Sequence, residues 1–157
     1  MKRYIYLFSL VISLAGLNSC SKSSDPAPDP VVVGKWASDY LLTSGFVAPY
    51  TSSNALKLNP LVYGINDVYD IKSDKTFVVT DRSTSVIQTF PGTWDYSGTQ
   101  LNLKYNDGNT ETLTYDASTT PAHLSFAPVA VQDTLQNPTT KVKEVVKFNL
   151  QLVYTKQ

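Results

Sequence analysis

Two reactive side chains occur only once in this chain of 157 residues, the thiol of Cys20 and the imidazole of His123. A single histidine cannot build a histidine-rich zinc site, and a catalytic triad needs a base beside both a nucleophile and an orienting acid. His123 alternates with Leu124 and Phe126, so we expect it to face away from them, towards solvent. No catalytic set emerges, and we expect that the protein is not an enzyme.

The acidic residues could bind a metal or catalyse hydrolysis if they converged. The segment Asn106–Glu111 is rich in oxygen ligands but lacks the spacing and length of an EF-hand loop. The Asp107-Gly108 dipeptide between two alternating runs predicts a hairpin instead, and Asp74 is likewise typical of a turn. A glycosidase pair is not indicated, because most other carboxylates lie in predicted turns or on polar faces: Asp70, Asp81, Asp95, Asp116 and Asp133. We therefore expect no metal and no cofactor.

Cys20, in contrast, follows a segment with the features of a secretory signal. Lys2 and Arg3 form a basic start, and Tyr4–Leu17 is a run of mostly apolar residues. Such a run is shorter than the roughly 20 residues that span a membrane as a helix. A basic start, a short apolar core and small residues after it are typical of a secretory signal peptide.

Leu17, Ser19 and Cys20 then resemble the lipobox of bacterial lipoproteins, although Asn18 departs from its usual residues. The resemblance implies cleavage between Ser19 and Cys20, a diacylglyceryl group on the sulfur of Cys20, and acylation of the new amine with a chain such as palmitate. The alternative is a plain cleaved signal with an incidental cysteine. Ser21 stands where an aspartate would suggest retention in the inner membrane, so the outer membrane is favoured, and the membrane face stays open.

The sequence divides into three parts: a signal peptide over residues 1–19, a lipidated cysteine and tether over 20–30, and one domain over 31–157. The tether is rich in proline and serine, which favours an extended, unfolded spacer. Loss of the signal takes away two of the 13 basic residues and none of the 13 acidic ones, for a net charge of −2. We do not expect nucleic acid as a partner, because the domain has no basic cluster. The expected partner is the membrane.

The domain reads as a series of alternating strands separated by turns, with no convincing amphipathic helix. The clearest strand is Lys141–Tyr154, and residues 101–105 and 109–115 form the predicted hairpin. The remaining strands are predicted within residues 31–42, 68–72, 76–81, 85–98 and 121–128, with a break near Pro91-Gly92. About eight strands at this spacing predict an all-β fold, an antiparallel up-and-down barrel. An immunoglobulin-like β-sandwich is the alternative.

Three stretches are similar to the lipocalin-like domains of small Gram-negative lipoproteins: GKW at residues 34–36, YDIKSDKTFVV at 69–79, and GTWDYSGTQLNL at 92–103. Lys75 stands where the family's hairpin often has glycine. The resemblance implies an eight-stranded lipocalin-like barrel that closes over Trp36. It implies no shared catalytic residues, and it leaves the ligand, a small apolar molecule, as an expectation.

Two long connections carry apolar residues. The segment Thr43–Ile65 is longer than most irregular connections, so we expect either a lid over an apolar cavity or a short extra element that plugs a filled barrel. The candidate ligand or lid residues are Trp36, Trp94, Phe46, Tyr50 and Tyr63. The segment 127–140 is expected to be a loop at the rim. Two functions follow: an anchored module that binds a small apolar ligand, or a filled barrel that docks an envelope protein.

The anchor can be tested by replacing Cys20 with serine, which removes the sulfur that would carry the lipid. We expect the Cys20→Ser protein to leave the membrane fraction, because each buried CH₂ of an acyl chain contributes about 0.8 kcal/mol to membrane binding. Fractionation of cells followed by immunoblotting measures the change. A variant that stays in the membrane fraction unchanged would contradict the lipid anchor.

Overall fold

The computed structural model describes residues 29–157. The predicted signal peptide, Cys20 and most of the tether lie outside these residues. Within residues 29–157, no helix has both the length and the apolar character needed to cross a membrane.

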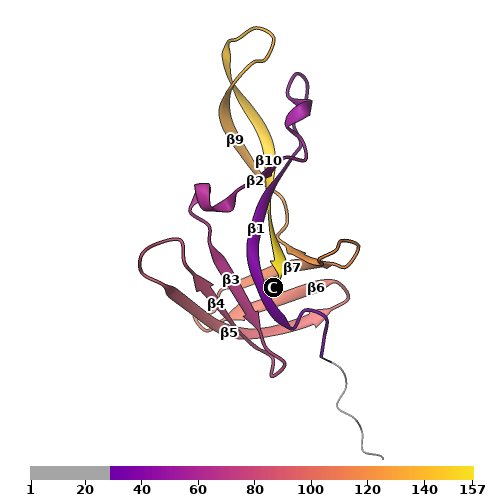
Figure 1. Cartoon of the computed structure of the whole chain (residues 1–157), viewed down its shortest axis with the longest axis vertical. Coiled ribbons are helices and arrows are strands. Elements are labelled where there is room, and N and C mark those ends of the chain that lie inside the picture. The colour runs from indigo at the N-terminus through magenta and orange to yellow at the C-terminus, as the bar shows by residue number, and fades with distance from the viewer. Residues whose placement is uncertain (1–28) are drawn as a thin grey trace, which may run out of the picture.

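Eight strands form a closed antiparallel barrel (Figure 1). They are β1 (Gly34–Ser44), β3 (Asp67–Ile71), β4 (Thr76–Asp81), β5 (Gln88–Ser97), β6 (Gln100–Tyr105), β7 (Thr110–Asp116), β8 (His123–Ser125) and β10 (Lys143–Lys156). Each of them pairs with the next in this order, and β10 returns to pair with β1, from Trp36 opposite Lys156 to Ser44 opposite Asn149. The prediction of an eight-stranded up-and-down lipocalin-like barrel is therefore confirmed, and the sandwich alternative is wrong.

The long connection after β1 contains short elements. They are two 3₁₀ turns, η2 (Thr51–Ser53) and η3 (Pro60–Tyr63), and the two-residue strand β2 (Lys57–Leu58), which pairs with β1. Thr43 fixes this connection to β1, because its hydroxyl donates to the carbonyl of Ser53 at 2.6 Å and accepts from the backbone N–H of Leu56 at 3.0 Å. Short extra elements were one of the two outcomes expected for this segment.

The second long connection is not the predicted loop. Residues 129–136 form β9 (Val129–Gln136), which pairs with the first half of β10, from Leu150 back to Lys143. The alternation of Val129, Val131 and Leu135 is interrupted by Asp133, and no side chain of β9 is fully buried, so the apolar face of this strand is weak. This β9–β10 ribbon, which we call the arm, stands clear of the barrel (Figure 1). A small cluster holds it: Phe46 and Tyr50 pack against Val146, with Leu135 and Phe148 at the edge.

A packed core fills the barrel. Its buried side chains come from every barrel strand and from the segment before β1: Val32, Trp36, Tyr69, Ile71, Phe77, Val79, Trp94, Leu101, Leu103, Leu113, Leu124 and Tyr154. One end of the barrel is closed by the chain that enters β1, where the indole N–H of Trp36 donates to the carbonyl of Val32 at 2.8 Å. Both residues are fully buried, so Trp36 belongs to the core at this end of the barrel.

The predicted break in the fifth strand is also absent, because β5 is continuous through Pro91 and Gly92. Gly92 allows this continuity. A Cβ atom at this position would lie 2.3 Å from the carbonyl oxygen of Lys104 and 2.6 Å from the ring of Phe77. The ring of Phe77 therefore lies directly over the backbone of β5, and only glycine leaves it room.

Gly92→Ala should consequently destabilise the barrel strongly. We expect a loss of about 3 kcal/mol or more in the free energy of unfolding, because overpacking a rigid core costs roughly 1–3 kcal/mol and here backbone atoms must also move. Urea denaturation measures the loss. Gly98→Ala is the control, because a Cβ atom at this position meets nothing within 4 Å. Its only cost is the backbone strain of an alanine at a φ of 61°, about 1–2 kcal/mol in the free energy of unfolding. Equal losses in the two variants would contradict the proposed contact of Phe77 with Gly92.

Candidate ligand site at the barrel mouth

The end of the barrel opposite Val32 and Trp36 is open and holds a pocket of about 510 Å³. We call this end the mouth. It is formed where β3 and β5 begin, where β4 and β6 end, and at the turn into β7. Ten residues line it: Asp67, Tyr69, Val79, Asp81, Phe90, Tyr105, Asp107, Asn109, Thr110 and Glu111. Four of the ten are carboxylates and none is basic.

Glu111 is held in place by two tyrosines. One of its carboxylate oxygens accepts hydrogen bonds from the hydroxyls of Tyr69 at 3.0 Å and Tyr105 at 2.5 Å. Burial raises the pKa of both tyrosines, so they stay neutral donors at any physiological pH. Tyr105 in turn packs edge-on against Phe77, with 5.0 Å between the ring centroids. The position of the carboxylate is therefore fixed by the core of the barrel.

Asp67 and Asp81 are a cross-strand pair of like charges. They lie directly opposite each other at the ends of β3 and β4, an arrangement that destabilises a sheet. Burial raises the pKa of Asp67, and the neighbouring charge of Asp81 raises it further. Hydrogen bonding from Ser83, whose backbone N–H is 2.7 Å from Asp81, lowers the pKa of Asp81. The sequence thus places a repulsive pair where a bound cation would relieve it.

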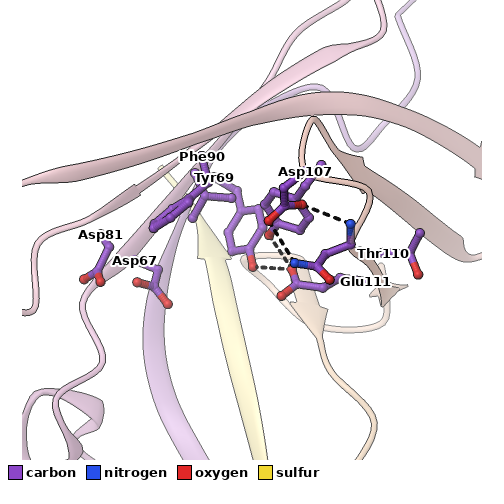
Figure 2. Close-up of a pocket in the computed structure, with 10 residues that line it drawn as sticks. Asp67, Tyr69, Asp81, Phe90, Asp107, Thr110 and Glu111 are labelled. Carbon is purple, nitrogen blue, oxygen red and sulfur yellow. Dashed lines mark hydrogen bonds between the residues drawn. The ribbon is translucent and has the colours of Figure 1, made fainter.

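Asp107 lies across the mouth from Asp67 and Asp81 (Figure 2). It accepts from the backbone N–H of Asn109 at 3.0 Å and from the Asn109 side chain at 2.8 Å, and Gly108 has a φ of 93°. The predicted hairpin is confirmed. In Figure 2, Asp67 and Asp81 lie on one side of Tyr69 and Phe90, while Asp107 and Glu111 lie on the other. Aromatic surface therefore lies between two pairs of carboxylates.

This arrangement suits an organic cation better than a metal ion. Among residues 29–157, no three histidine, cysteine, aspartate or glutamate side chains approach closely enough to hold a metal. Phe90 is 41% exposed beside the carboxylates, and aromatic rings attract ammonium groups. The mouth can therefore hold an ammonium or guanidinium group among its carboxylates while the apolar part of the same molecule contacts Phe90 and Val79.

None of the five residues predicted to contact a ligand lines the mouth. Trp36 closes the opposite end, and Trp94 donates to the carbonyl of Lys72 at 2.9 Å in the turn between β3 and β4. Phe46 stacks on Phe148 of the arm with 4.4 Å between ring centroids, and the hydroxyl of Tyr50 donates to Glu144 of the arm at 2.7 Å. Tyr63 is half exposed in η3. The lid hypothesis therefore gains no support from these contacts.

The residues of the mouth carry a signal that sequence reasoning missed. In β3 the inward-facing residues are Tyr69 and Ile71, and Asp67 has the same parity in the strand. Asp81 likewise follows Phe77 and Val79, and Glu111 precedes Leu113. A carboxylate at an inward position near a strand end is unusual, because inward positions are normally apolar. That pattern, repeated on three strands, could have indicated the site.

Comparisons of the chain with protein-family models, with curated proteins and with solved structures found no match.

The repulsion in the mouth predicts that Asp67→Asn stabilises the protein at neutral pH. The pKa of Asp67 is raised above its ordinary value of 3.8 in the folded state, so the ionised form weakens folding as the pH rises through and above that value. We expect a higher melting temperature for Asp67→Asn at pH 7 and no difference from the wild type below about pH 2.5, more than one unit under the ordinary aspartate pKa, where the side chain is protonated in both states. Thermal unfolding across this pH range measures the effect.

Asp74→Asn is the matched control. Asp74 lies in a turn at the other end of the barrel, where hydrogen bonds from Thr76 lower its pKa. Its replacement should lower the melting temperature at pH 7, the opposite sign. A loss of stability in both variants at pH 7 would contradict the repulsion assigned to Asp67 and Asp81.

Proposed function

We propose that this protein is a membrane-anchored envelope lipoprotein whose lipocalin-like barrel is a binding module, and that its mouth takes the cationic end of a small organic ligand. The observation that carries the proposal is the two pairs of carboxylates on either side of the exposed Phe90 at the open end of the barrel (Figure 2). Lipocalin-like barrels commonly hold small ligands at this place in the fold.

The packed core modifies the small apolar ligand expected from the sequence. The interior positions are occupied by side chains such as Phe77 and Leu101, which are fully buried. The apolar part of a ligand would then contact the walls of the mouth, at Phe90 and Val79, rather than enter the barrel. We therefore propose an amphiphilic cation in place of a purely apolar molecule.

A binding role is also favoured over a catalytic one. His123 lies outside the mouth, with its ring edge-on to Tyr40 at 5.8 Å between centroids. Glu111 accepts hydrogen bonds from two tyrosine hydroxyls, which fix its position in the mouth. A carboxylate fixed in this way is suited to orienting a positively charged group.

The anchor and its location belong to the same proposal. The lipobox-like residues 17–20 support lipidation of Cys20, and the absence of aspartate at position 21 favours the outer membrane. The tether joins the barrel at the closed end, through Val32. The mouth would therefore open away from the point of attachment, free to meet ligands in the surrounding compartment.

Docking of an envelope partner is the second candidate function. The observation that favours it is the outer part of the arm, residues 129–148, which takes no part in the barrel core and carries the exposed Val129, Val142 and Val145. A binding mouth and a docking arm are compatible, because they involve different strands.

The charge preference of the mouth can be tested with three ligands of similar shape. We expect 2-phenylethylamine, a cation at pH 7, to bind in the millimolar range, and we expect 2-phenylethanol and 3-phenylpropanoate to bind at least about tenfold more weakly, a difference of about 1.4 kcal/mol. NMR titration of the isotope-labelled protein measures affinity and location together, through the amide signals of β3, β4 and β7.

Matched aspartate variants supply the control. Asp81 and Asp74 each accept a hydrogen bond from the backbone N–H two residues later, but only Asp81 lies in the mouth. Asp81→Asn should weaken amine binding several-fold, and Asp74→Asn should leave it unchanged. Equal affinity for the amine and the alcohol would show that the charge of the mouth does not select its ligand, and the proposal of a cationic ligand would fail.

A further inference from the structure

One face of the arm carries positive charge and has no covering element. Side chains of directly paired residues lie on the same face of a sheet, so the pairing of β9 with β10 divides the arm into two faces. Val146, Phe148 and Leu135 lie on the face that packs against Phe46 and Tyr50. The other face, which we call the lysine face, consists of Lys143, Val145, Lys147, Gln132, Thr134 and Gln136, all of them exposed.

The lysine face is complementary in charge to the mouth. It carries two lysines and no carboxylate, with Val145 between them at 64% exposure. The mouth carries four carboxylates and no basic residue, and exposed apolar residues adjoin it: Phe90 within the pocket, and Val86 and Ile87 in the preceding loop. Each surface thus combines charged with apolar side chains, and the charges of the two surfaces are opposite in sign.

The lysine face of one chain points away from its own mouth. Leu152 and Tyr154 of β10 face the barrel interior, and side chains alternate along a strand. The residues of odd number in β10, which include Lys143, Val145 and Lys147, therefore continue the outer surface of the barrel. An intramolecular contact between the two surfaces would require the arm to turn over, and the pairing of β10 with β1 prevents that.

We propose that the lysine face of one molecule docks in the acidic mouth of a second copy of this chain. The lysine ammonium groups would meet the carboxylates of Asp67 and Asp81, and Val145 would contact Phe90. This proposal rests on the function proposed above, because it takes a lysine side chain as one cationic group that the mouth accepts. Exposed ion pairs alone contribute little, so the contact is weak and depends on the apolar residues and on high local concentration.

The contact is of the head-to-tail type, which has a testable consequence. Two different surfaces of each molecule are used, so each docked copy leaves one arm and one mouth free for further copies. Association therefore continues beyond a dimer, into rings or open chains. Anchoring in one membrane would concentrate the copies and favour the contact.

Sedimentation velocity of the full-length protein in a density-matched detergent tests the proposal. We expect average mass to increase beyond the dimer as protein concentration rises, and we expect the association to weaken at least about tenfold when salt is raised from about 0.02 M to 0.5 M, because salt screens exposed charges. Excess 2-phenylethylamine should dissociate the complex. A protein that stays monomeric at low salt and millimolar concentration would overturn the proposal.

Two variants make the test specific. Lys143→Glu with Lys147→Glu reverses the charge of the lysine face, and Asp67→Asn with Asp81→Asn removes two of the four carboxylates of the mouth. Each variant alone should be monomeric, whereas a mixture in equal amounts should form a dimer and nothing larger, because only one intact arm and one intact mouth remain. Pairing through the free edge of β9 would instead leave the mouth variant able to self-associate, and that result would also overturn the proposal.

Binding of 2-phenylethylamine separates this proposal from the one on which it rests. The arm variant should bind the amine as the wild type does, because its mouth is unchanged, and we expect its melting temperature to match that of the wild type, which checks that it is folded. Amine binding without any association would overturn the docking of a second copy alone. If the wild type neither binds the amine nor associates, the proposal of a cation-binding mouth is overturned as well.

Discussion

The pairing of β1 with β10 is the interaction on which the rest of the structure depends. It joins the first strand of the domain to the last, from Trp36 opposite Lys156 to Ser44 opposite Asn149. Without it the sheet would be open, and β1 and β10 would be exposed edge strands that carry the apolar side chains of Trp36 and Tyr154. Such edges promote aggregation. Both strands are longer than their neighbours, so the same pairing continues past the mouth and provides the base of the arm. One register thus fixes the barrel and the ribbon that extends from it.

The two ends of the barrel differ because different residues occupy their inward positions. At the closed end, the segment before β1 brings Val32 under Trp36, and the indole N–H finds a backbone carbonyl, so no polar group is left unpaired. At the mouth, inward positions are taken by Asp67, Asp81 and Glu111. Glu111 is held by two tyrosine donors, and Asp67 accepts one long hydrogen bond of 3.5 Å from the hydroxyl of Tyr154. The apolar core thus ends at Tyr69 and Tyr105, and a layer of carboxylates lies beyond it at the open end.

The local patterns predicted the barrel well, and the residues that failed show where such patterns lose force. Strands with a buried face, such as the one with Leu101 and Leu103, were recognised by alternation, and Asp107-Gly108 marked its hairpin. The strand β9 was missed because Asp133 interrupts its alternation and none of its side chains is fully buried, so the pattern is weak. The mouth was missed for a different reason. Its contacts join residues far apart in the chain, such as Tyr69 with Glu111, and only barrel closure brings them together.

The arm depends on a few interactions that lie outside the barrel core, which bears on its role. A two-stranded ribbon is marginally stable in water by itself, and this one is held mainly by Phe46 stacked on Phe148 and by Tyr50 bonded to Glu144. Burial and this hydrogen bond raise the pKa of Tyr50 to about 12, so the donor is retained at neutral pH. The segment that could have covered the mouth as a lid supports the arm instead. Phe46 and Tyr50 therefore keep an exposed ribbon ordered. Because this order adds nothing to the barrel core, we expect the ribbon to act by contact with another molecule.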